Sequence, residues 1–171
     1  MKLNEINKTE EDPEVEKTES KGGTFIAIRP STESVKRITK FMKTNKIPSK
    51  NKDLHCTLVY SGVHLPTFHD IDDKKIVPGA PATIAKFEMW NSHNTEDSKN
   101  VLVAILKCDW ANNRNKEIMS TTEATTDYPN YKAHMTISYD VPDDFDVKSL
   151  EWVDGDIVFD IEYVEPLDPT D

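Results

Sequence analysis

His55-Cys56-Thr57-Leu58 and His134-Met135-Thr136-Ile137 are two copies of one unit, His-x-Thr-apolar, and each lies inside a strand-like run. In an extended strand, residues two apart share a face, so each unit presents one imidazole and one hydroxyl on the same side. Two such strands lying together would surround one cavity with two imidazoles and two hydroxyls. A single histidine in a strand is usually a structural residue, but the matched second copy favours a functional site.

The chain of 171 residues is of a length typical of one globular domain with loose ends. Residues 1–23 are rich in Glu, Lys, Thr and Asn and end at Gly22-Gly23, which predicts a flexible acidic tail. The domain is expected to cover residues 24–165, and residues 166–171 are expected to form a mobile acidic end.

The hydrophobic pattern predicts strands and helices in a repeated order, strand, helix and His-containing strand, once in each half of the chain. A surface loop is expected between the first His strand and the next strand. The predicted strands are residues 25–28, 54–61, 82–91, 101–108, 133–140 and 157–164, and the predicted helices are residues 32–46, 110–123 and a short turn near 148–152.

The net charge of −10 repels a polyanion, so long DNA or RNA is not an expected partner, whereas a small phosphorylated ligand remains compatible. The only two cysteines, Cys56 and Cys108, fall in predicted strands, and no signal-peptide pattern opens the sequence. No apolar stretch approaches the roughly 20 residues that span a bilayer. These features predict a reduced cytoplasmic protein, without membrane insertion.

Two imidazoles suit phosphodiester cleavage, because one can accept the proton of the attacking oxygen while the other donates a proton to the leaving oxygen. The two threonine hydroxyls could hold the non-bridging phosphate oxygens. This chemistry needs neither metal nor cofactor, and His64, His69 and His93 are expected to be solvated loop residues and not zinc ligands. In a ribonucleotide, the neighbouring 2′-hydroxyl is a ready nucleophile.

The two units, 79 residues apart (134 minus 55), resemble the 2H phosphoesterase superfamily over about residues 24–165. The resemblance implies an α+β fold of two pseudo-symmetric lobes, each an antiparallel sheet with outer helices, around a central cleft. It also implies His55 and His134 as the acid and base, and Thr57 and Thr136 as phosphate contacts. Within the superfamily, the short acidic chain with its tail before Phe25-Ile26-Ala27-Ile28-Arg29-Pro30 is most similar to the phage anti-CBASS cyclic-oligonucleotide nucleases.

Three further residues are candidates for substrate binding. Trp90 alternates with the predicted core residues Phe87 and Met89 and could stack a base, although it could equally pack against a loop. Glu162 could accept a hydrogen bond from a base amino group, and Phe25 could contact the ligand, although a solvated face and core packing are their ordinary roles. Tyr60 and Tyr139 fall by alternation on the face opposite the His and Thr side chains and are not expected in the site.

The sequence therefore predicts a monomeric, metal-independent phosphodiesterase that cleaves 3′-5′ linkages of cyclic di- or trinucleotides such as cyclic GMP-AMP. By resemblance, it would act in the host cytoplasm to evade CBASS immunity. One alternative is a phosphodiesterase of RNA ends or 2′,3′-cyclic nucleotides, which would benefit from a basic track that this chain lacks. Another is a non-catalytic sponge for cyclic nucleotides, which would not need two proton-transfer groups.

Overall fold

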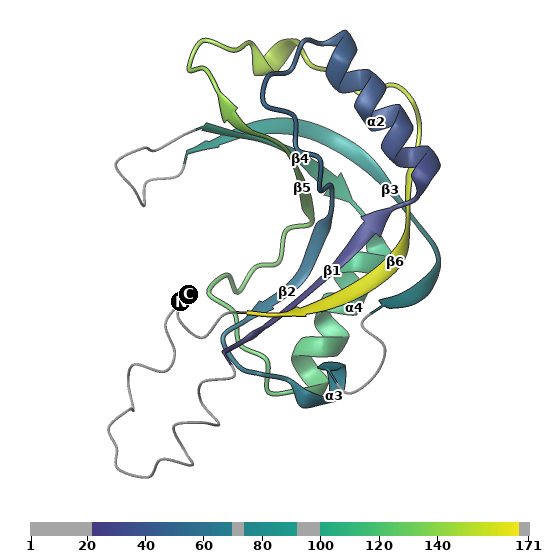
Figure 1. Ribbon diagram of the computed structural model, residues 1–171, viewed down its shortest axis with the longest axis vertical. Helices are drawn as coiled ribbons and strands as arrows, with labels where there is room; N and C mark the ends of the chain where they lie inside the picture. The colour runs from purple at the N-terminus through teal and green to yellow at the C-terminus, as the bar shows by residue number, and fades with distance from the viewer. Residues whose placement is uncertain (1–21, 70–73, 92–99, 168–171) are drawn as a thin grey trace.

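The computed structural model describes residues 22–69, 74–91 and 100–167 (Figure 1). Nearly all of the predicted N-terminal tail and most of the predicted C-terminal end lie outside these residues. The strands are β1 (Thr24–Pro30), β2 (Cys56–Ser61), β3 (Lys74–Asn91), β4 (Asn100–Lys107), β5 (His134–Val141) and β6 (Ile157–Pro166), and the helices are α2 (Thr32–Thr44), α3 (Pro66–His69), α4 (Asp109–Thr121) and the 3-10 turn η2 (Val147–Ser149).

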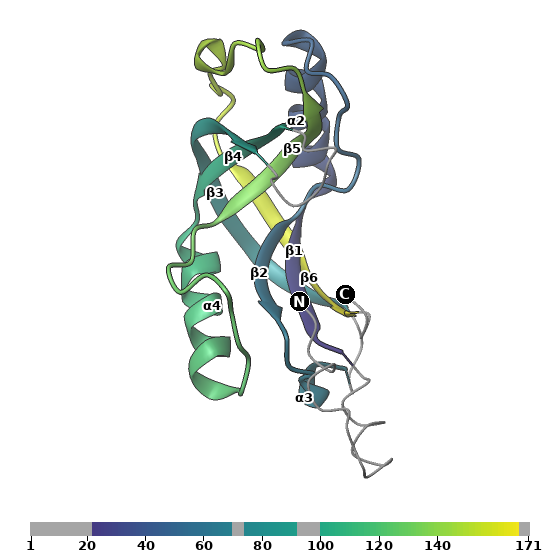
Figure 2. The ribbon, with the colours of Figure 1, turned by 90° about the vertical axis from the view of Figure 1, so that its left-hand side faces the viewer.

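The six strands form one antiparallel sheet that closes on itself in the order β1-β2-β5-β4-β3-β6. The α+β class is confirmed, but the sheet is continuous, whereas the sequence predicted two separate ones. The reason is that the long strand β3 pairs with β4 near one end and with β6 near the other. Figures 1 and 2 show the helices on the outside of this sheet, with α2 and α4 far apart.

Each half of the chain contributes a strand, a helix and a His strand in the predicted order. Helix α2 follows β1, and its N-cap is Ser31, whose side chain accepts a hydrogen bond from the backbone N–H of Ser34. The buried residues of α2 include Ile38, Phe41 and Met42, which recur at helical spacing. Helix α4 follows β4 and buries Ala111 and Ile118, despite the three asparagines that weaken its helix propensity.

Three predicted element boundaries were wrong. The segment predicted as a loop after β2 contains α3, and β3 begins at Lys74, eight residues before the predicted start. The sequence does not predict this extension, because it contains Pro78, Gly79 and Pro81, residues that usually end a strand. In the structure β3 bends there, with a register shift between Ile76 and Ala80 and a positive φ at Gly79. Strand β6 also continues to Pro166, which pairs with Thr24.

Both His strands contain a β-bulge four residues into the repeated unit. In the β1/β2 pair, Ile26 faces Val59 and Ala27 faces Thr57, so Leu58 has no partner of its own in this register. In the β4/β5 pair, Leu102 faces Ser138 and Val103 faces Thr136, so Ile137 is the extra residue. Each bulge reverses the alternation of the residues that follow it.

The core fills the space between the sheet and the outer helices. Its largest fully buried side chains include Phe159, Ile26, Ile28, Ile38, Met42, Leu58, Leu102, Ile118, Met135, Ile137 and Ile157. No helix in the described part of the chain is long and apolar enough to cross a membrane.

Candidate active site

The two His strands meet at one pair of residues. Cys56 of β2 faces Met135 of β5, each being the second residue of its unit. Continuing this antiparallel register by one residue sets His55 opposite Thr136 and Thr57 opposite His134, all on the same face. Opposite residues lie about 5 Å apart across strands, and residues two apart along a strand lie about 7 Å apart. The imidazoles therefore stand at diagonal corners of a small rectangle and the threonines at the other two.

Both imidazoles are held in the same way. The Nδ1 atom of His55 lies 2.9 Å from the carbonyl oxygen of Asp53, and Nδ1 of His134 lies 2.8 Å from that of Lys132, in each case two residues earlier. A carbonyl only accepts, so Nδ1 carries a proton in both rings. In the neutral imidazole, Nε2 is then the atom free to accept a proton.

Side chains and backbone from neighbouring segments support the two threonine-containing strands. The Tyr131 hydroxyl donates to the carbonyl of Thr57 at 2.6 Å, and the Asn51 side chain donates to the carbonyl of Thr136 at 2.9 Å. The backbone N–H of Asn51 also donates to the carbonyl of Ile137 at 2.9 Å. These bonds anchor β2 and β5 where the sheet itself joins them by a single residue pair.

Trp90 forms a wall beside His134. The two ring centroids are 4.7 Å apart, and the indole N–H donates to the Glu88 carboxylate at 2.8 Å. Burial lowers the pKa of His134 from its ordinary value, and the nearby charge of His55 lowers it further. The hydrogen bond from Trp90, together with Lys86, lowers the pKa of Glu88 to about 2, so this carboxylate is charged at neutral pH.

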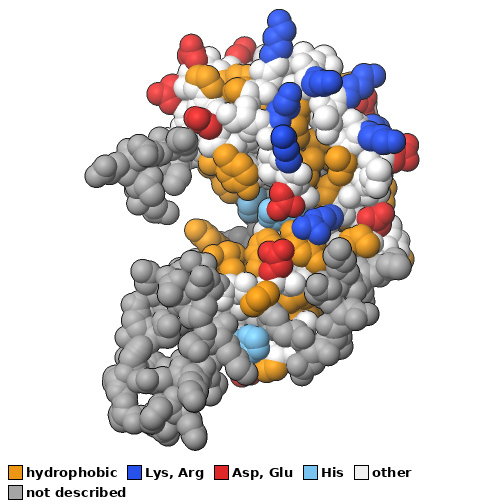
Figure 3. Space-filling view, viewed as in Figure 1, with side chains coloured by type: hydrophobic (Ala, Val, Ile, Leu, Met, Phe, Trp, Pro, Cys, Tyr) orange, Lys and Arg blue, Asp and Glu red, His pale blue; other side chains and the backbone are white. Residues whose placement is uncertain are grey.

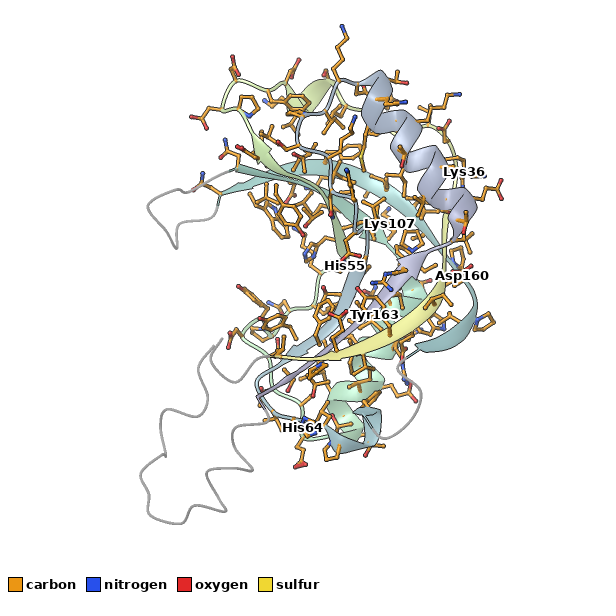
Figure 4. All side chains as sticks on the ribbon, in the orientation of Figure 1. Lys36, His55, His64, Lys107, Asp160 and Tyr163 are labelled. Carbon is orange, nitrogen blue, oxygen red and sulfur yellow. The ribbon has the colours of Figure 1, made fainter. Side chains whose placement is uncertain are left out.

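Phe25 forms the corresponding wall beside His55. Its ring meets the imidazole edge-on at 5.5 Å and also contacts Tyr163 at 6.0 Å. Arg29 lies 3.9 Å above the Tyr163 ring and 3.5 Å from the carboxylate of Asp53. This side of the site therefore carries a cation close to the segment that holds His55, and Figure 4 shows His55 and Tyr163 on the inner side of the molecule.

A cavity of about 440 Å³ opens beside the two units. In the space-filling view, histidine side chains lie at the inner end of a hollow, with hydrophobic side chains on either side (Figure 3). Thr57 and His134 line the cavity from the two units, and the other lining residues are Leu58, Val59, Tyr60, Trp90, Asn115, Met119, Thr126, Tyr128, Asn130, Tyr131 and Lys132. Its size and its mixture of aromatic and polar side chains suit a small ligand.

The structure brings six of the seven sequence-predicted residues together. His55, Thr57, His134 and Thr136 share the central face, with Trp90 and Phe25 against the two histidines. Glu162 is 4% exposed, and its two carboxylate oxygens accept hydrogen bonds from Arg114 at 2.8 and 2.9 Å. A contact between Glu162 and a base would require this ion pair to open.

Sequence reasoning missed Arg29, Asp53 and Lys132 around the histidines. Arg29 alternates with Phe25 and Ala27 in β1, a signal that could have found it. The carbonyls of Asp53 and Lys132 that hold the two imidazoles leave no trace in the side-chain pattern. Among the described residues, no group of three or more His, Cys, Asp or Glu side chains could hold a metal ion.

Comparisons with known proteins identify the family of the chain. Residues 22–171 match the family model described as anti-CBASS protein Acb1. Three curated proteins of that name are similar to the chain: one from Vibrio phage KVP40 (28% identity, 85% of this chain and 88% of the relative), one from Escherichia phage RB16 (29%, 81% and 75%) and one from Salmonella phage S16 (26%, 85% and 88%). The resemblance to phage anti-CBASS proteins is confirmed, and the chain belongs to the anti-CBASS protein Acb1 family.

Proposed function

We propose that this protein is a metal-independent phosphodiesterase that cleaves 3′-5′ linkages of cyclic di- or trinucleotides and so protects a virus from CBASS immunity. The observation that carries the proposal is the matched pair of imidazoles, each with Nδ1 bound to the carbonyl two residues earlier. Membership of the Acb1 family supports the anti-CBASS role. In this proposal the protein acts as a monomer in the host cytoplasm.

The proposed architecture is that of the 2H phosphoesterases, with two lobes related by a pseudo-twofold axis. The segments β1-α2-β2 and β4-α4-β5 would be the equivalent parts. The axis would pass between Cys56 and Met135, which occupy the same place in the two units. Each lobe then supplies one histidine, one threonine and a bulge at the residue that follows the threonine.

In the proposed mechanism, His134 is the general base and His55 the general acid. Burial favours neutral His134, whose free Nε2 can take the proton of the attacking 2′-hydroxyl. A protonated His55 lies 3.9 Å from the Asp53 carboxylate and can give a proton to the leaving 5′-oxygen. Thr57 and Thr136 donate hydrogen bonds to the non-bridging oxygens, and Arg29 adds positive charge nearby.

The first test replaces each histidine. His55→Ala and His134→Ala are expected to lower the rate of ring opening by at least about a hundredfold, as loss of an acid or base typically does. The measurement is product formation from a panel of cyclic di- and trinucleotides in excess EDTA. His93→Ala serves as the control and should retain wild-type rates, since the sequence predicts His93 to be solvated; it lies outside the described residues.

The outcomes separate the proposal from its alternatives. Cleavage of linear RNA ends in preference to rings would favour the RNA-processing alternative. Tight binding of a ring without turnover by the wild-type protein would favour a sponge. Loss of activity in EDTA would contradict the metal-independent mechanism.

The second test concerns the nucleophile. A ring whose scissile linkage follows a 2′-deoxyribose should bind but resist cleavage, because the attacking group and its proximity advantage are gone. A ribose ring should instead yield a 2′,3′-cyclic phosphate or the phosphate derived from it. A deoxy ring opened at a comparable rate would show that a histidine activates water.

A further inference from the structure

The repeated unit is six residues long and ends in tyrosine, as His-Cys-Thr-Leu-Val-Tyr and His-Met-Thr-Ile-Ser-Tyr. Strict alternation would turn both tyrosines away from the site, but the bulges reverse it. Leu58 and Val59 are consecutive buried residues, at 1% and 3% exposure, and Ile137 and Ser138 are both fully buried. Tyr60 and Tyr139 therefore return to the face of the histidines and threonines, which corrects the expectation from alternation.

The two tyrosines have the same place in the unit and nearly the same exposure, 49% for Tyr60 and 51% for Tyr139. Their surroundings differ. Tyr60 faces Phe25 in the register of β1 and β2, their rings lie 6.1 Å apart, and Tyr60 lines the 440 Å³ cavity together with Trp90 and His134. Tyr139 is not among the described residues that line this cavity.

We propose that Tyr60 is a base-stacking residue, which holds one nucleobase of the substrate in this cavity while the adjoining phosphate lies at the two units. The inference rests on the proposed function. A nucleobase has two apolar faces and a polar edge, and the cavity offers both kinds of partner. Tyr60, Trp90 and Tyr128 supply aromatic rings, whereas Asn130 and Lys132 supply polar groups.

The distance of Tyr60 from the two units favours a role in substrate binding and not in proton transfer. It lies three residues beyond Thr57 along β2, about 10 Å from it at the usual strand rise, or less because of the bulge. That distance exceeds hydrogen-bond reach but matches the separation of a base from its own phosphate. Tyr60 is thus a substrate-binding residue, and its aromatic ring, more than its hydroxyl, contacts the substrate.

The test compares Tyr60→Leu, Tyr60→Phe and the matched control Tyr139→Leu. Affinity is measured for an uncleaved 2′-deoxy cyclic dinucleotide that contains 2-aminopurine, whose fluorescence is quenched when it stacks. Stacking on an aromatic side chain contributes about 1–3 kcal/mol per base, so Tyr60→Leu should raise Kd by roughly 10- to 100-fold and remove the quenching. Tyr60→Phe and Tyr139→Leu should stay within about twofold of the wild type on the same scale.

Each outcome has a separate meaning. If the wild-type protein binds the ring but Tyr60→Leu binds as tightly as Tyr139→Leu, the stacking role is wrong and the proposed function stands. If Tyr60→Phe is as weak as Tyr60→Leu, the hydroxyl and not the ring makes the contact, which also overturns the inference. If the wild-type protein binds no ring at all, the proposed function fails together with it.

Discussion

At the scale of single residues, the two histidines are distinguished by their surroundings. Both have Nδ1 bound to a backbone carbonyl, but His134 lies against the Trp90 indole, whereas His55 meets the edge of Phe25 and lies near Asp53. The two units thus place their histidines in different surroundings, which the neighbouring strands supply. Burial favours the neutral form of His134, which is the form a general base needs.

The lowered pKa of His134 predicts the shape of the pH profile. A base must be neutral, so kcat/KM should fall on the acid side only as pH drops through the pKa of His134, which lies below the ordinary value of 6.5. Because burial is the main cause, Trp90→Ala should move this acid limb upward toward 6.5. The measurement is kcat/KM on a ribose ring under chemistry-limited conditions. The pH is varied from about 4.5 to about 8, a range that brackets the ordinary histidine pKa of about 6.5.

Tyr139→Ala is the control for this shift, because it also removes a half-exposed aromatic side chain. It should leave the acid limb where it is in the wild type. An acid limb that stays fixed in Trp90→Ala would mean that burial by Trp90 does not lower the pKa of His134. An acid limb that disappears in His55→Ala but persists in His134→Ala would exchange the assigned roles of the two histidines.

At the scale of elements, a local sequence signal decides where α2 starts. Ser31 closes the N-terminus of α2 through its bond to the backbone of Ser34, and its own backbone N–H donates to the carbonyl of Val158 in β6 at 2.7 Å. The cap therefore joins the helix to the sheet as well as starting it. Helix α2 packs against β1 and β6, the two strands that pair beside it.

Ser31→Ala should destabilise the fold by about 1 kcal/mol, the usual cost of losing a serine cap. The measurement is the free energy of unfolding in urea. Thr32→Ala, at the neighbouring exposed position, should change it by less than about 0.5 kcal/mol. Equal effects of the two substitutions would mean that the Ser31 side chain does not act as a cap.

Most elements could be predicted from the sequence because their signals are local. Hydrophobic alternation marks the part of β3 from residue 82 onward, a continuous apolar run marks β4, and helical spacing marks α2. The bulges at Leu58 and Ile137 could not be predicted, since a bulge depends on the partner strand and leaves the residues unchanged. The histidines and threonines precede the bulges, so alternation assigns them to the correct face of the sheet. Tyr60 follows a bulge, so alternation assigns it to the wrong face.

At the scale of the whole molecule, one ion pair ties distant parts together. Arg114 on α4 binds both oxygens of Glu162 on β6, and a further contact reaches Glu117 at 2.9 Å. The Glu162 side chain is 4% exposed and the Arg114 side chain 15% exposed, so the pair is largely shielded from water. Removing one partner would leave the other charge buried.

Arg114→Met should therefore lower the free energy of unfolding by about 3–5 kcal/mol, the usual cost of breaking a buried pair. Lys116→Met, at an exposed position of the same helix, is the control and should have little effect. Combining Arg114→Met with Glu162→Gln should recover part of the loss, because no uncompensated carboxylate then remains. Thermal or urea unfolding of the three variants is the measurement.

Glu162→Gln alone examines the predicted contact between Glu162 and a base. If Glu162 only supports the fold, Glu162→Gln should lower stability while the KM of the folded enzyme is unchanged. A rise in KM at full folding, with no change of stability, would instead mean that the carboxylate leaves Arg114 to meet the substrate.

The single residue pair between β2 and β5 has a mechanical consequence. Every other junction of the closed sheet has at least five register pairs, so the ring is least stiff where Cys56 faces Met135. That compliant point lies between the two histidines. The spacing of the two imidazoles therefore depends less on ladder pairing than on the side-chain bonds of Asn51 and Tyr131 to the carbonyls of Thr136 and Thr57.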